Sequence, residues 1–409
     1  MPLGLYISVP FCRSKCSYCN FASGVFSRER FEQYVERVSA DLDAAPALAE
    51  RVGGRFERAA DSLYLGGGTP TALAPEQFAC LFEAVRRNFA LTADVEITVE
   101  CAPGSLNPPM LDALVRSGVN RVSLGVQSFV DAEAAAVGRL HTRAAVLDDV
   151  AHLRAAGISN LNVDLIAGLP HQTPESWEYS LDEAIALGAP HVSVYMLEVD
   201  EDSRLGRELI AGGTRYHAHF VPNDDVTADF YLRACERLEA AGIPQYEISN
   251  FARPDAESRH NLKYWTRRPY LGFGVDAHSM LPALDPALEA VRFSTPDSLD
   301  DYLAGRSGSV IAVSRQSASE ESLFLGLRLN RGLDLAEAAA RFGAAALESV
   351  RPAILRSEEA GLLEQEGNRI RLTSRGRLLS NEVFAGFLSS RQPSALPRPA
   401  RVELSTKIH

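Results

Sequence analysis

The chain has 409 residues, of which 46% are hydrophobic and 23% charged, a composition typical of a globular protein. Its 53 acidic and 41 basic residues give a net charge of −12, which disfavours nucleic acid as the main partner. No apolar run approaches the roughly 18 residues that a membrane span needs, and residues 1–10 lack a secretory signal. We therefore expect a cytoplasmic protein without a membrane span.

From residue 3 to residue 241, strand-like apolar runs alternate with helical patterns. The expected strands are Leu3–Val9, Ser62–Leu65, Val95–Val99, Arg121–Leu124, Leu161–Ile166 and His191–Tyr195. The expected helices are Arg30–Leu42, Pro75–Asn88, Pro108–Ser117, Thr142–Ala156, Pro174–Leu187 (capped by Thr173) and Asp225–Ala241. Six alternations predict an α/β fold with a parallel sheet, in which ligands bind at the C-terminal ends of the strands.

The pattern changes after Leu281. Residues 282–313, which are rich in Ala, Pro, Asp and Ser, are interpreted as a connecting region. Residues 314–388 are expected to form a small helical domain that resembles a winged helix, and residues 389–409 a disordered tail. The expected elements of the small domain are helices at Ser314–Leu329, Leu333–Phe342, Leu347–Ala360 and Gly376–Phe387, with a hairpin within Leu362–Ser374.

Three of the six cysteines fall within eight residues, at Cys12, Cys16 and Cys19. Thiolates are preferred ligands of iron–sulfur clusters and zinc, and a closed structural zinc site needs four ligands. Three thiolates would hold three irons of a [4Fe–4S] cluster and leave the fourth open to a small chelating molecule. Zinc with a remote fourth ligand and three metal-free thiols are the alternative interpretations.

Glycine and polar residues follow the later strands of the predicted sheet. Glycines in Gly66–Thr71 let backbone groups approach a ligand without a Cβ in the way, and a plain tight turn is the alternative. A phosphate-binding loop would need a terminal Gly-Lys-Ser or Gly-Lys-Thr, which this segment lacks. Glu100, Gln127 and Asp164 lie at the ends of the third, fourth and fifth strands, and Arg139 follows the fourth. We expect these side chains to converge on one pocket.

The CxxxCxxC spacing directly after a first strand resembles that of radical S-adenosylmethionine (SAM) proteins. From residue 3 to about residue 388 the chain also resembles the oxygen-independent coproporphyrinogen III oxidase family. The motifs that carry this resemblance are Tyr6-Ile-Ser-Val-Pro-Phe-Cys12, Leu65-Gly-Gly-Gly-Thr-Pro-Thr71, Ser123-Leu-Gly-Val-Gln-Ser-Phe129, Gly138-Arg-Leu-His141 and Asp164-Leu-Ile-Ala-Gly-Leu-Pro170.

The resemblance implies a partial (β/α)6 radical-SAM barrel over residues 1–281, in which SAM chelates the open iron. It also implies an electron donor such as flavodoxin or ferredoxin. Carboxylate and amide groups suit the ribose hydroxyls of SAM, and a cation suits its carboxylate. The SAM contacts implied by the resemblance are Tyr6, Tyr18, Gly67, Gly68, Thr69, Glu100, Gln127, Arg139 and Asp164.

Two features depart from the oxidase. The oxidase has a further cysteine where this chain has Phe21, and a substantial segment before its first strand, which here begins at residue 3. Three motifs instead resemble the HemW family of heme chaperones: Cys19-Asn-Phe21, Gln245-Tyr-Glu-Ile-Ser-Asn-Phe-Ala252 and His260-Asn-Leu-Lys-Tyr-Trp265. This resemblance implies a carrier that binds heme and transfers it to an acceptor protein, with the cluster and SAM in a supporting role.

His260 is the candidate heme ligand, because imidazole is a usual axial ligand of heme iron. The favoured alternative is that His260 and Asn261 fix a turn while Tyr264 and Trp265 fill the mouth of the barrel. For the whole protein, the main alternative is an enzyme of porphyrin biosynthesis that oxidatively decarboxylates two propionates of coproporphyrinogen III. Radical chemistry on another substrate and a DNA-binding regulator are further alternatives, the last disfavoured by the acidic charge.

Overall fold

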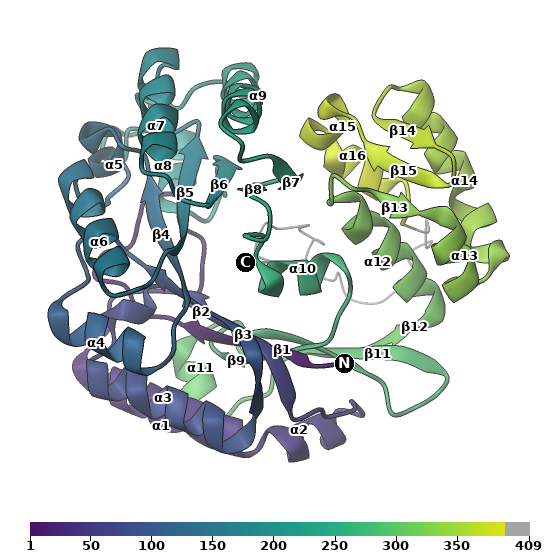
Figure 1. Cartoon of the computed structure of the whole chain (residues 1–409), viewed down its shortest axis with the longest axis horizontal. Helices are drawn as coiled ribbons and strands as arrows, with labels where there is room; N and C mark the ends of the chain where they lie inside the picture. Colours follow the sequence, from purple (N-terminus) through teal and green to yellow (C-terminus); the bar gives the residue numbers. More distant parts are fainter. Residues whose placement is uncertain (389–409) are drawn as a thin grey trace.

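The protein, described for residues 1–388 in a computed structural model, is built on one large sheet (Figure 1). Six parallel strands of this sheet lie side by side in chain order, which confirms the prediction from the alternating pattern. They are β1 (Leu3–Val9), β2 (Ala59–Gly67), β3 (Ala90–Cys101), β4 (Arg121–Gln127), β5 (Asn160–Ala167) and β6 (His191–Met196). The expected tail, residues 389–409, lies outside the described residues.

Helices between these strands cover the outer face of the sheet (Figure 1). They are α1 (Arg28–Asp43), α2 (Ala45–Arg51), α3 (Pro75–Asn88), α4 (Pro108–Arg116), α5 (Asp131–Ala136), α6 (Arg143–Ala155) and α7 (Pro174–Ala186). Thr173 caps α7 as expected, since its hydroxyl accepts a hydrogen bond from the backbone N–H of Ser176. Helices α2 and α5 were not expected, because one or two turns are too short to show a helical period.

Side chains alternate between the two faces of each strand, because successive residues of a strand point in opposite directions. On β4, Val122, Leu124 and Val126 pack into the hydrophobic core beneath the helices. Arg121 and Ser123 on the same strand face an interior cavity. The partial barrel therefore has an apolar outer layer and a polar interior.

The sheet extends beyond the six parallel strands at both edges. Next to β6 lie β8 (Asn250–Ala252) and β7 (Gln245–Glu247), and next to β1 lie β9 (Tyr270–Gly274), β10 (His278–Pro282), β11 (Leu288–Ser294) and β12 (Val310–Ser314). Strand β9 is parallel to β1, and the outer strands are antiparallel to their neighbours. Residues 282–313, interpreted above as a connecting region, thus supply β11, β12 and α11 (Leu299–Leu303) to the main body.

Three helices lie in the segment between β6 and β9. They are α8 (Arg204–Ala211), α9 (Asp224–Ala240) and α10 (Arg259–Trp265). Of these, only α9 was predicted. Within residues 1–388, no helix combines the length and the apolar composition that crossing a bilayer would require.

The C-terminal part has its own small core and the expected winged-helix-like order of elements. These elements are α12 (Arg315–Leu327), β13 (Leu333–Asp334), α13 (Leu335–Phe342), α14 (Ala344–Glu359), β14 (Leu363–Glu366), β15 (Arg369–Leu372), α15 (Ser374–Leu378) and α16 (Ser380–Ala385). Leu333 and Asp334, expected to be helical, pair with β15 instead, and Asp334 caps α13 through its side chain. Leu323, Ile354, Ile370 and Phe384 contribute to the core between the helices and the three-stranded sheet.

A buried ion-pair network joins this C-terminal part to the main body. Glu321 on α12 pairs with Arg267, 2.9 Å away and only 3% exposed, and with Arg292 on β11 at 3.0 Å. Removing the shared carboxylate would leave two guanidinium groups close together without an anion.

We predict that Glu321→Ala lowers the free energy of unfolding by about 3–5 kcal/mol, the usual cost of breaking a buried ion pair. The matched control is Glu348→Ala on α14, whose partner Arg351 is 66% exposed, and we expect a change of at most about 0.5 kcal/mol there. Urea unfolding followed by circular dichroism measures both. Equal effects of the two substitutions would contradict the proposed role of the network.

Candidate functional site

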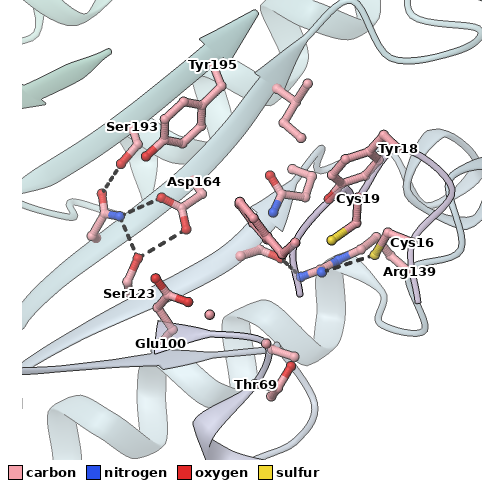
Figure 2. Close-up of a pocket in the computed structure, with 18 of the residues that line it drawn as sticks. Cys16, Tyr18, Cys19, Thr69, Glu100, Ser123, Arg139, Asp164, Ser193 and Tyr195 are labelled. Carbon is pink, nitrogen blue, oxygen red and sulfur yellow. Dashed lines mark hydrogen bonds between the residues drawn. The ribbon is translucent and has the colours of Figure 1, made fainter. Parts of the chain in front are cut away.

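A cavity of about 650 Å³ lies inside the partial barrel, within the size range of small-molecule sites (Figure 2). Its walls come from the cysteine loop, the inner faces of β2 to β6, and the C-terminal part, which contributes Arg328 and Arg377. Most of the side chains expected at the site meet here. They are Cys12, Cys16, Tyr18, Cys19, Gly67, Gly68, Thr69, Glu100, Gln127, Arg139 and Asp164.

The three cysteines lie on the loop between β1 and α1, and all three thiols are free. Lys15 ties this loop together by donating hydrogen bonds to the carbonyl groups of Phe21 and Ser23. Burial raises the pKa of Cys12 and that of Cys19, and the neighbouring Cys16 adds to both shifts. A bound cationic centre would therefore be needed to keep the three sulfurs ionised together.

The donor set at this end of the cavity consists of sulfur. The three cysteines line one cavity. Three soft sulfur donors at one end of a cavity are what a [4Fe–4S] cluster with an open iron requires.

The glycine-rich turn after β2 positions the cysteine loop. The N–H of Gly68 donates to the carbonyl of Val9 at 2.7 Å, and the N–H of Thr69 donates to that of Phe11 at 2.7 Å. A Cβ on Gly68 would lie 2.7 Å from the Phe11 oxygen and 2.8 Å from the Val9 oxygen, so no side chain fits. Gly67 has a φ of 97°, which also favours glycine. The turn therefore holds the start of the cysteine loop against the end of β2.

Arg139 and Gln127 present unpaired polar atoms close to the cysteines. The guanidinium of Arg139 lies 3.6 Å from the Cys16 sulfur and also donates a hydrogen bond to the carbonyl of Gly125. Gly125 leaves room for this guanidinium, because a Cβ at that position would lie 2.8 Å from it. The Nε of Arg139 and the Oε1 of Gln127 are buried and have no hydrogen-bond partner in the described part of the chain. Buried polar atoms of this kind indicate a ligand that would satisfy them.

Two carboxyl groups lie across the cavity from the cysteines (Figure 2). Tyr64 donates to Glu100 at 2.9 Å, while Asp164 accepts from Ser123 at 3.1 Å and from Asn162 at 2.7 Å. Burial, reinforced by the charge of Asp164, raises the pKa of Glu100 to about 8, and burial also raises the pKa of Asp164. A ligand with hydroxyl groups would find both a carboxyl donor and a carboxylate acceptor here.

The sequence analysis missed several polar residues of the cavity wall. Ser123, Asn162, Ser193 and Tyr195 lie on the same inward faces as the predicted residues. The period of two along each strand could have identified them, since Ser123 precedes Gln127 by four residues and Asn162 precedes Asp164 by two.

Tyr6 and His260 are not among the residues that line the cavity. The ring of Tyr6 packs against Tyr64 and His260, with ring centres 6.1 and 6.3 Å apart. His260 is fully buried, and its ring nitrogens lie 2.9 Å from the hydroxyls of Ser62 and Tyr264. Burial lowers the pKa of His260 to about 3. Heme ligation by His260 would require breaking one of these contacts, so the geometry favours the packing role, and direct contact of Tyr6 with SAM is likewise unsupported.

Comparison with known proteins identifies the family. The Radical SAM superfamily model matches residues 6–184, and the HemN C-terminal domain model matches residues 313–379. The heme chaperone HemW of Bacillus subtilis is 33% identical, with 94% of this chain and 98% of that protein covered. The chain belongs to the HemW family. HemW of Mycobacterium tuberculosis is 34% identical, with 95% of each chain covered.

The fold is shared with coproporphyrinogen III oxidase (HemN) of Escherichia coli, described as a radical SAM enzyme. The two chains superpose with a TM-score of 0.80 at 26% identity, covering 94% of this chain and 90% of the other. Both resemblances found in the sequence are thus confirmed, as is the α/β fold with a radical SAM barrel and a C-terminal domain. Radical SAM membership implies a [4Fe–4S] cluster and SAM, and the thiols and unpaired polar atoms of the cavity fit both.

The raised pKa of Glu100 predicts a pH effect on stability in the protein without ligands. Between pH 4.5 and about 8 the folded state keeps a proton that the unfolded state loses, so the free energy of unfolding falls as pH rises, by about 1.4 kcal/mol for each pH unit. We expect Glu100→Gln, which retains an acceptor for Tyr64, to flatten this slope. Urea unfolding at pH 5.5, 7 and 8 measures it. Glu76→Gln, an exposed position on α3, should keep the wild-type slope, and parallel curves for wild type and Glu100→Gln would contradict the assignment.

Proposed function

We propose that the protein is a cytoplasmic heme chaperone that holds a [4Fe–4S] cluster on Cys12, Cys16 and Cys19, binds SAM beside it, and transfers heme to an acceptor protein. The observation that carries this proposal is the near full-length likeness to proteins named heme chaperone HemW. The cavity supports it, because three thiols and a set of unpaired polar groups meet there.

The residues of the cavity would each have a role towards SAM. Arg139 places a cation beside Cys16, where a carboxylate would neutralise it. Glu100, protonated over much of the neutral range, can donate to a hydroxyl group, and Asp164 can accept from one. When bound, the cluster supplies one-electron chemistry fed by a donor such as flavodoxin or ferredoxin.

A second candidate function is the oxidative decarboxylation of coproporphyrinogen III, favoured by the overall likeness to the Escherichia coli oxidase. The residue at position 21 argues against it. Phe21 lines the cavity, at the place where the oxidase has a further cysteine. This replacement removes a polar, reactive group from the immediate neighbourhood of the cluster thiols.

Cluster binding gives a direct prediction. Anaerobically reconstituted protein should contain about four irons and four sulfides per chain, and replacing Cys12, Cys16 and Cys19 together by alanine should remove them. Cys80→Ala, which changes an exposed thiol outside the cavity, should retain the full content and serves as the control. Iron and sulfide analysis with the absorption spectrum measures both. Retention of the cluster in the triple variant would exclude these ligands.

The chaperone and the oxidase are distinguished by one assay. The reconstituted protein is incubated anaerobically with reductant, SAM and coproporphyrinogen III, and in parallel titrated with heme. We expect one heme per chain and no multiple-turnover formation of protoporphyrinogen, because Phe21 stands in place of the further cysteine. Many turnovers per chain would support the oxidase, and absence of heme binding would overturn the chaperone proposal.

A further inference from the structure

Four further polar residues line the same cavity and are called here the inner polar cluster: Arg121, Asn250, Asn261 and Arg328. Arg121 begins β4, whereas Gln127 ends it, so the two are separated by roughly 20 Å along an extended strand. The other three come from β8, α10 and the C-terminal end of α12. The inner polar cluster is therefore built from both domains of the chain.

Arg121 is the unusual member of this cluster. Its side chain is among the largest fully buried ones in the described residues, and the residue is 2% exposed. It forms no hydrogen bond and no ion pair within residues 1–388, and its Nε is buried without a partner. A buried guanidinium without hydrogen bonds is costly, so an acceptor that reaches this position would stabilise it.

The neighbours of Arg121 leave its hydrogen-bond donors open. Glu247 is engaged by Arg328 at 3.3 Å and by the amide of Asn250. Glu100 and Asp164 interact with the charge of Arg121 through space, while their carboxyl groups accept hydrogen bonds from Tyr64, Ser123 and Asn162. The guanidinium of Arg121 can therefore still donate to an acceptor in the cavity.

Further unpaired atoms in the cluster indicate that it is an incomplete binding site. The Nε of Arg328 is buried without a partner in the described chain, as is that of Arg121, and both can donate to a carboxylate. The Oδ1 atoms of Asn250 and Asn261 are also unpaired there, and as acceptors they suit a hydrogen-bond donor of the ligand or a water molecule rather than its carboxylate. Asn250 and Asn261 are 3% and 8% exposed. Arg328 is held in place by Glu247 and by stacking on the Trp265 ring, 4.2 Å from its centre. The cluster is pre-organised and faces the cavity.

We propose that the inner polar cluster binds a carboxylate of the tetrapyrrole, with Arg121 as the main contact and Asn261 and Arg328 as further contacts from the same cavity wall. A guanidinium group matches a carboxylate in a two-pronged geometry, and an amide can add a further hydrogen bond. The carboxylate of SAM has its own cation in Arg139 at the cysteine end, so Arg121 serves a second acidic molecule. This inference rests on the proposed function, because propionate side chains are the acidic groups that heme carries.

The test compares heme with heme dimethyl ester, in which both propionates are blocked. Reconstituted wild-type protein, Arg121→Gln, Arg121→Lys and the surface control Arg116→Gln are titrated with each compound by absorption spectroscopy. We expect the wild type and Arg116→Gln to prefer heme, and Arg121→Gln to lose about 10- to 100-fold in heme affinity while its affinity for the ester stays unchanged. Arg121→Lys should keep part of the preference, because a cation remains.

Circular dichroism checks that the variants fold. If Arg121→Gln does not fold, Asn261→Asp replaces it, since an added negative charge should weaken binding of heme but not of the ester. Equal affinities of the wild type for heme and its ester, or equal losses for both in the variant, would overturn the inference and leave the chaperone proposal standing.

Failure of the proposed function itself has a different signature. If the wild type does not bind heme, coproporphyrin III and its tetramethyl ester are used as probes in the same titration. Binding of the free acid alone, lost in Arg121→Gln, would retain the carboxylate site and transfer it to the oxidase alternative. Binding of neither compound would overturn both.

Discussion

The close approach of two backbone segments, the end of β2 and the start of the cysteine loop, is the constraint on which the site depends. Gly68 and Thr69 donate hydrogen bonds to the carbonyl groups of Val9 and Phe11, at a distance that excludes any Cβ on Gly68. This contact fixes where the loop leaves the barrel. Because all three thiols lie within eight residues of that point, their position over the cavity follows from it.

The interior of the barrel is polar because its strands alternate between an apolar outer face and an inner face of hydroxyl, amide and charged groups. Most of these groups satisfy one another, as Ser123, Asn162 and Asp164 do. Among the cavity-lining residues, Gln127 and Arg139 keep unpaired atoms near the cysteines, and Arg121 keeps an unpaired atom at the opposite end of β4 from Gln127. A polar interior with unpaired groups at both ends of one strand is suited to more than one polar ligand group.

The C-terminal domain forms part of this interior. Arg328 and Arg377 line the same cavity as the three cysteines, and Glu321 anchors α12 to the main body through Arg267 and Arg292. A winged-helix-like arrangement therefore serves here to close a small-molecule cavity. The fold of a domain does not by itself determine its function, because its contacts depend on the other parts of the protein that pack against it.

The amino-acid sequence by itself determined the order of the six parallel strands, the cysteine loop and most of the residues around it, because local periodicity and motif spacing are properties of short segments. Strands β9 to β12 were not predicted from the sequence. For β11 and β12 the reason is that they lie in a segment whose composition resembles that of a linker. Only the tertiary structure decided the surroundings of His260 and Arg121. Both are buried polar residues, and their side-chain hydrogen-bond partners cannot be read from the local sequence. The ring nitrogens of His260 contact the hydroxyls of Ser62 and Tyr264, whereas the Nε of Arg121 has no partner among the described residues. Burial and hydrogen-bond pairing depend on how the whole chain packs, so a local sequence pattern does not predict them.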